Sequence, residues 1–94
     1  MPRPRLRRRI CFNPAVTYFK PAGIPLKTLE EVTIKQDELE ALRLNNLKGL
    51  SQEEAAEQMK ISQPTLHRLL VEARKKVTDA LVNGKAIKIE NEKE

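Results

Sequence analysis

Two apolar patterns of helical period lie close together in the stretch AAEQMKISQPTLHRLL, residues 55–70, and this feature most constrains the fold. The first pattern stops at Lys60 and the second starts after Ser62. So short a break between two helices is typical of a helix-turn-helix unit, in which the two axes cross closely. The second pattern also carries polar side chains on a face that its leucines do not occupy, and the function must explain that face.

Capping residues indicate where both helices begin. Ser51 and Glu54 form a capping box that predicts a short helix over about 52–59. Ser62 is a good N-cap for the next helix, whose apolar residues recur at intervals of three and four. That spacing predicts a longer helix over about 63–82.

The residues around the break fit a close crossing. Ala56 is small enough to face the next helix, Ile61 can fill the gap between the helices, and Leu66 can anchor the second against the first. The turn position at Lys60 favours glycine, because the backbone there adopts a positive φ. A lysine should cost on the order of 1 kcal/mol, so we expect Lys60→Gly to stabilise the protein.

Weaker patterns precede this unit. Leucines near helical spacing predict a helix over about 36–48, with Gly49 as its stop. Its N-cap is not obvious, although Thr33 and Gln36 form a potential capping box one turn early. The sequence LEEVTI at 29–34 is compatible with a short strand or with the approach to the helix.

The sequence AIKIE at 86–90 alternates apolar and charged residues, as a half-buried strand does. A single strand needs a partner, and RICF at 9–12 is the expected one, in the same or a second subunit. The predicted fold is mainly α, a three-helix helix-turn-helix core with short extended or strand segments at both ends. The chain then divides into a flexible basic arm, an extended segment packing on the core, the helix-turn-helix domain and an acidic tail, over residues 1–9, 10–29, 30–90 and 91–94.

Composition argues against several classes of protein. One cysteine, Cys11, and one histidine, His67, cannot supply the four ligands of a structural zinc site, so we expect no metal and no cofactor. No nucleophile–base pair or carboxylate cluster indicates an enzyme, and Cys11 is better explained as a small apolar residue than as a thiol paired with His67. No apolar run approaches the roughly 20 residues that a membrane helix needs, and no secretory signal is recognisable, so a cytoplasmic protein is expected.

The charge distribution favours a polyanionic partner. The formal net charge is +5, and basic residues concentrate before residue 21 and again from 61 to 88, with an acidic block between them. Glu72 is the only acid between 61 and 78. This pattern favours DNA binding by the second helix over a solvated helix hairpin in an all-helical bundle.

A helix in the major groove would read bases with its outward face. Gln63 suits adenine, Arg68 suits guanine, and an apolar side chain could touch a thymine methyl. The candidate base-contacting residues are Gln63, Pro64, His67, Arg68 and Val71. The candidate phosphate-contacting residues are Gln52, Ser62, Thr65, Arg74 and Lys75, and Lys76 continues this basic run.

The N-terminal arm adds a second basic segment. It contains Arg3, Arg5, Arg7, Arg8 and Arg9. Either it is a disordered solubilising tail, or it lies along the DNA backbone or in the minor groove.

Residues 37–81 resemble region four of the bacterial sigma factors, the helix-turn-helix that reads the promoter −35 element. Nearly the whole chain is similar to a small uncharacterised prokaryotic family, domain of unknown function 134. The shared segments are MPRP, RRICF.P.VTYFKPAGIPL, DELEALRL, GLSQEEAA and VNGKAI, at residues 1–4, 8–26, 37–44, 49–56 and 82–87. The resemblance implies a DNA-binding protein with no established target. In that family the position of Lys60 commonly holds glycine and that of Pro64 is often not proline, which leaves the base preference open.

The chain is not expected to be a sigma factor, because nothing in it corresponds to region two, which melts promoters and binds the core polymerase. The first hypothesis is a DNA-binding transcriptional regulator, which could dimerise through its end strands or its long third helix. The alternatives are a protein-interaction module, for example one that contacts RNA polymerase, and an RNA-binding protein. RNA ranks last because few aromatic residues (Phe12, Tyr18, Phe19) are available for base stacking.

Overall fold

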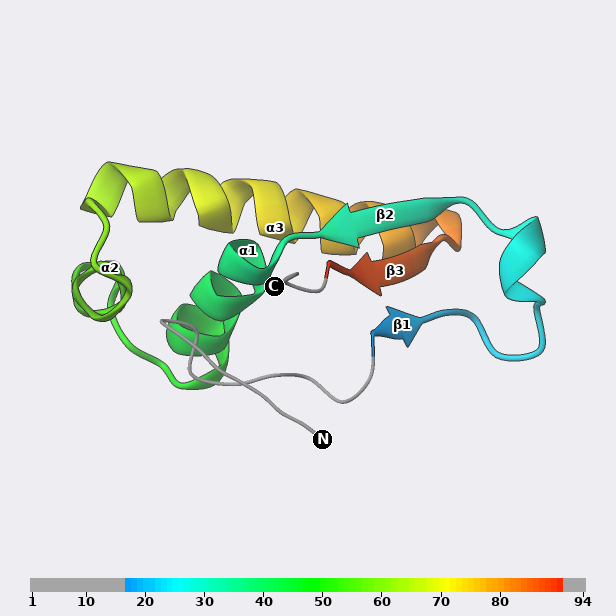
Figure 1. Cartoon of the computed structure of the whole chain (residues 1–94), viewed down its shortest axis with the longest axis horizontal. Coiled ribbons are helices and arrows are strands. Elements are labelled where there is room, and N and C mark those ends of the chain that lie inside the picture. The colour runs from blue at the N-terminus through cyan, green and yellow to red at the C-terminus, as the bar shows by residue number, and fades with distance from the viewer. Residues whose placement is uncertain (1–16, 91–94) are drawn as a thin grey trace, which may run out of the picture.

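Three α-helices and three short strands make up residues 17–90, the part of the chain that the computed structural model describes (Figure 1). The fold is mainly α with short strands toward both ends, as predicted. The elements in chain order are β1 (Tyr18–Phe19), a 3-10 turn η1 (Leu26–Thr28), β2 (Glu31–Ile34), α1 (Gln36–Leu42), a π-helical turn η2 (Arg43–Leu47), α2 (Gln52–Met59), α3 (Gln63–Asn83) and β3 (Ala86–Ile89).

The helix boundaries follow local signals. The predicted bounds of α2 are confirmed, and α3 ends one residue later than predicted, where Gly84 takes a left-handed conformation. The predicted helix over 36–48 is α1 followed by η2, in which the turns widen before the chain leaves the helix.

The cap of α1 differs from the prediction. Its N-cap is Lys35, whose backbone N–H donates to Glu38 Oε1 at 3.0 Å. The suggested capping box of Thr33 and Gln36 is wrong, because Thr33 belongs to β2 and lies opposite Lys88 of β3. The reciprocal half of the cap is therefore made by an acid one turn into the helix.

The strands form one sheet with β3 in the middle, in the order β1-β3-β2. β3 is antiparallel to β1 and parallel to β2, so that Ile87 lies between Phe19 and Val32. The prediction that 86–90 pairs with RICF is wrong: β1 and β2 occupy both sides of β3, and residues 9–12 lie outside the described part. β3 pairs with β2 because of the length of α3. This helix is about 31 Å long and carries the chain back to the point where β2 starts, so that Ala86 lies opposite Glu31.

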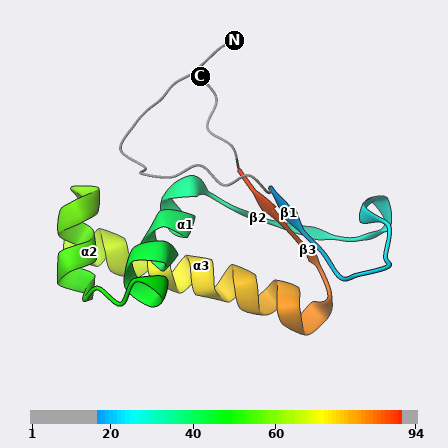
Figure 2. The same cartoon turned by 90° about the horizontal axis from the view of Figure 1, so that it is seen from below.

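The core has two parts along α3. Ala41, Leu44, Ala55, Ala56, Leu66 and Leu70 form a buried cluster where the three helices meet. Farther along α3, Ala73 and Ala80 are buried, and the sheet contributes Ile34, Ala86 and Ile89 to the core. Figures 1 and 2 show α1 and α2 beside the amino-terminal half of α3 and the strands beside its other half. The side of α3 that faces away from both remains exposed.

None of the helices described in residues 17–90 is long and apolar enough to cross a membrane.

Candidate nucleic-acid interface

The break between α2 and α3 has the predicted conformation. Lys60 adopts φ 61° and ψ 43°, in the left-handed region, and ends α2. The backbone N–H of Ile61 donates to the carbonyl of Ala56 at 3.1 Å, which closes the turn. Ala56 and Leu66 are buried and Ile61 packs against their cluster. The three positions expected to support a close helix crossing therefore do so.

The amino end of α3 is held by Ser62 and Thr65. Ser62 Oγ accepts from the Thr65 N–H at 3.2 Å, and the Ser62 hydroxyl donates to Thr65 Oγ1 at 2.8 Å. Arg68 Nη2 lies 3.5 Å from the same Thr65 oxygen. These contacts fix the first turn of α3. Pro64 has no N–H and the Leu66 N–H donates to the Ser62 carbonyl, so within the described residues the Gln63 N–H is the one amide of this turn left to bind a ligand.

The predicted base-contacting residues lie together on the exposed side of α3. Gln63, Pro64, His67 and Arg68 are exposed, and Val71 retains 50% of its surface. Leu66 and Leu70, on the opposite side of the same turns, are fully buried. A large apolar side chain such as Val71 left half exposed beside Arg68 gives the face both polar and apolar groups.

The first residue of α2 reaches this face. His67 Nδ1 lies 3.4 Å from Gln52 Oε1. Gln52, predicted to contact phosphate, is thereby placed beside a predicted base-contacting residue. The start of α2 and the first two turns of α3 therefore form one continuous surface.

The predicted phosphate-contacting residues Arg74 and Lys75 differ in their surroundings. Lys75 is exposed, and its side chain makes no hydrogen bond or ion pair with any described residue. Arg74 donates to Asn45 Oδ1 at 2.7 Å and to Asn46 Oδ1 at 3.1 and 3.3 Å. Its guanidinium thus joins α3 to η2, a contact that no sequence pattern indicated.

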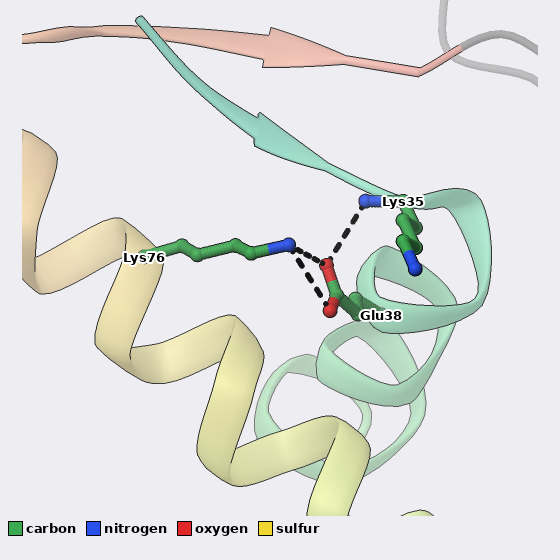
Figure 3. A network of polar contacts seen from close by, with 3 residues as sticks. All are labelled: Lys35, Glu38 and Lys76. Atoms are coloured by element: carbon green, nitrogen blue, oxygen red, sulfur yellow. Dashed lines mark hydrogen bonds and ion pairs between the residues drawn. The ribbon is translucent and has the colours of Figure 1, made fainter.

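Lys76 does not extend the basic run on the exposed side. Its Nζ lies 2.9 Å from Oε1 and 3.2 Å from Oε2 of Glu38, whose residue surface is 3% exposed (Figure 3). Glu38 also accepts the Lys35 N–H, so the buried carboxylate is satisfied by α3 and by the α1 cap. Helical spacing could have revealed this, because Lys76 lies between the buried Ala73 and Ala80 at intervals of three and four.

A second buried acid lies nearby in α1. Glu40 is 3% exposed and accepts two hydrogen bonds from the Arg43 guanidinium, both at 2.9 Å. No sequence signal distinguishes either buried glutamate, because an acid in an amphipathic helix is usually solvated. Both acids are paired with a basic side chain, Glu38 with Lys76 and Glu40 with Arg43.

Charges at the far end of α3 are paired with each other. Asp79 accepts from Asn83 Nδ2 at 2.7 Å and from Lys85 Nζ at 3.0 Å. These two hydrogen bonds, the one from Asn83 first, hold the pKa of Asp79 below its ordinary value. The bond to Asp79 raises the pKa of Lys85 above its ordinary value. This end of the helix therefore carries little net charge.

Within residues 17–90, no three His, Cys, Asp or Glu side chains gather where they could hold a metal ion. Cys11 and the arm residues Arg3, Arg5, Arg7, Arg8 and Arg9 lie outside the described part, so their predicted roles stay predictions.

Comparison with known proteins identifies relatives over almost the whole chain. The family model described as "Protein of unknown function DUF134" matches residues 1–93. The UPF0251 protein of Caldanaerobacter subterraneus subsp. tengcongensis is 58% identical over 90 residues, which cover 96% of this chain and 76% of that protein. UPF0251 proteins of Moorella thermoacetica and Dehalococcoides mccartyi are 58% and 59% identical over 96% of this chain, covering 60% and 77% of their own lengths. No solved structure gives a significant match.

Proposed function

We propose that this chain, which belongs to the DUF134 family of proteins of unknown function, binds double-stranded DNA and regulates transcription. The observation that carries the proposal is the turn at Lys60, which joins α2 to a capped α3 whose exposed side bears Gln63, Arg68 and Val71. This is the arrangement that a helix-turn-helix needs to present one helix to the major groove.

In this proposal the exposed face of α3 reads base edges. Gln63 donates to and accepts from adenine, Arg68 donates twice to guanine, and Val71 packs against a thymine methyl. Gln52, Lys75 and the Gln63 N–H at the start of α3 contact phosphates and set the register of the helix. His67 lies between these two sets, in contact with Gln52.

Charge and sequence likeness support the same function. The chain carries a formal net charge of +5, and Lys75 and Arg68 point to solvent while Lys76 and Lys85 are paired with acids. The likeness of residues 37–81 to region four of sigma factors supports a role at promoters. Transcriptional regulation is the part of the proposal that rests on this likeness.

The first test is fluorescence anisotropy with mixed-sequence duplex DNA over a series of salt concentrations, with an RNA hairpin as competitor. Micromolar binding with a steep negative salt slope is expected for the duplex. An operator selected from random duplexes then allows a test of whether the exposed face of α3 reads the bases. Gln63→Ala with Arg68→Ala should lose a few kcal/mol of specific binding, because each good base contact contributes about 1–3 kcal/mol.

The matched control is Gln58→Ala with Lys27→Ala, which removes the same numbers of amides and positive charges from exposed positions elsewhere. It should retain operator affinity. Equal affinities for both double variants would exclude the exposed face of α3 as the reading surface. No duplex binding at low salt would reject the proposed function.

A protein partner is the second candidate, because three aliphatic side chains are largely exposed. Leu47, Leu81 and Val82 retain 80%, 75% and 74% of their surfaces. Such positions suit contact with RNA polymerase or with a second copy of this chain. β3 is paired on both sides within the chain, and the exposed Leu81 and Val82 make the end of α3 the surface that a dimer would use. Sedimentation of the wild type against Leu81→Lys tests this.

A further inference from the structure

Arg74 makes a fork-shaped contact that joins two elements far apart in the sequence. Its Nη2 donates to both Asn45 and Asn46, and its Nε donates to Asn46. Asn45 in turn donates its Nδ2 to the carbonyl of Leu50 at 2.8 Å. The guanidinium, η2 and the chain that follows η2 are thus connected by side-chain hydrogen bonds.

The segment 45–52 leads from η2 to the start of α2. It is attached to α3 at one end through Arg74 and at the other through the Gln52–His67 contact. Arg74 follows His67 by seven positions, which is about 10 Å along a helix. The segment, called the rim below, is therefore tied to α3 at two points on the side that bears His67 and Arg74.

This rim offers free donors and no acid. The sequence from 41 to 52 contains no Asp or Glu. Lys48 is exposed, and among the described residues neither its Nζ nor the Asn46 Nδ2 has a hydrogen-bond or ion-pair partner. Asn46 is bonded to Arg74 of α3, and Lys48 follows Asn46 by two positions. The exposed face of α3 is the one proposed to enter the groove, where a phosphate backbone borders it.

We propose that Arg74 is a positioning residue that holds this rim in place, and that Lys48, with the Asn46 amide, contacts a backbone phosphate of the bound duplex. This inference rests on the proposed function. It replaces the expectation that Arg74 itself contacts phosphate, because three hydrogen bonds already direct its guanidinium toward Asn45 and Asn46. A lysine at this position has no counterpart of the Nε–H that donates to Asn46, and its flexible ammonium lacks the fixed plane of the guanidinium, so it should hold the two amides less firmly.

A double-mutant cycle of Arg74→Lys and Lys48→Ala tests the inference by anisotropy on duplex DNA. Lys48→Ala should reduce the salt slope by about 0.9, the value for one phosphate contact. Arg74→Lys keeps the charge and should weaken binding about fivefold, as expected for one net hydrogen bond. If Arg74 acts through the rim, its effect should be clearly smaller in the Lys48→Ala background, where only the Asn46 amide remains to be positioned.

Lys75→Ala is the control for direct contact, and its effect should add to that of Lys48→Ala. Additive effects of Arg74→Lys and Lys48→Ala would overturn the inference, because they would make Arg74 an independent contact. So would an unchanged salt slope for Lys48→Ala.

A measurement without DNA separates this inference from the proposed function. The N–H groups of Lys48 and Leu50 donate to the carbonyls of Arg43 and Leu44, and their hydrogen exchange reports the order of the rim. Arg74→Lys should speed their exchange several-fold, while Lys75→Ala should not. Unchanged exchange overturns the positioning role of Arg74. Faster exchange in a protein that binds no duplex would reject the proposed function and the phosphate contact. Only the structural role of Arg74, holding the rim in place, would then remain.

Discussion

Replacing Lys60 by glycine should stabilise the protein. Lys60 is exposed and holds φ 61° and ψ 43° at the end of α2, where its Cβ crowds the backbone. Among residues 17–90 it is the only non-glycine residue with a positive φ. It makes no hydrogen bond or ion pair through its side chain with the described residues, so the substitution removes little else.

The expected gain is the difference between two opposing effects. Relief of the left-handed conformation contributes about 1–2 kcal/mol in favour of the glycine variant. The greater backbone freedom of glycine in the unfolded chain costs about 0.5–1 kcal/mol. The net gain is about 0.5–1 kcal/mol, which corresponds to a rise of roughly 4 °C in Tm for a domain of this size.

The assay is thermal and urea denaturation followed by circular dichroism, without DNA. Lys60→Ala is the first control, because it removes the same charge and keeps the Cβ, and it should gain nothing. Lys48→Gly is the second control. Lys48 has φ −84°, so glycine relieves no strain there and should cost about 0.5–1 kcal/mol.

The comparison between glycine and alanine at position 60 decides the outcome. A Lys60→Gly midpoint at or below that of Lys60→Ala would refute the reasoning, since the two differ only in the Cβ. The turn between α2 and α3 would then not carry the strain that its dihedral angles indicate.

Two further predictions concern ion pairs. Because the pKa of Asp79 is lowered from an ordinary value of 3.8, its contribution to stability is present above that pH and disappears as the pH falls through the lowered pKa. Thermal melts in the acid range should show a shallower loss of stability for Asp79→Asn than for the wild type, and parallel curves would contradict this. Lys76→Met should cost about 2 kcal/mol in urea denaturation, because it leaves the Glu38 carboxylate buried without its cation, discounted for the partial exposure of Lys76. Adding Glu38→Gln should recover most of this loss, and a double variant as unstable as the single one would argue against an uncompensated charge.

The sequence determined the local structure of the helix-turn-helix unit. Ser51 and Ser62 each cap a helix by bonding to a residue only three positions later. The starts of α2 and α3 could therefore be predicted from a few neighbouring residues, without knowledge of the rest of the fold. The positive φ of Lys60 and the burial of Ala56 and Leu66 followed from spacing. The exposed face of α3 was predictable for the same reason, because helical periodicity separates Gln63 and Arg68 from the leucines.

The tertiary structure alone decided which distant groups meet. Arg74 contacts Asn45 and Asn46 and Lys76 contacts Glu38 across 28 to 38 positions of sequence, and β3 pairs with β1 and β2 instead of with RICF. A basic residue on α3 has the same intrinsic chemistry whether it faces DNA, an amide or a buried acid. Which of these it meets depends on where the fold places α1, η2 and the sheet along α3, and periodicity within one helix carries no information about that placement.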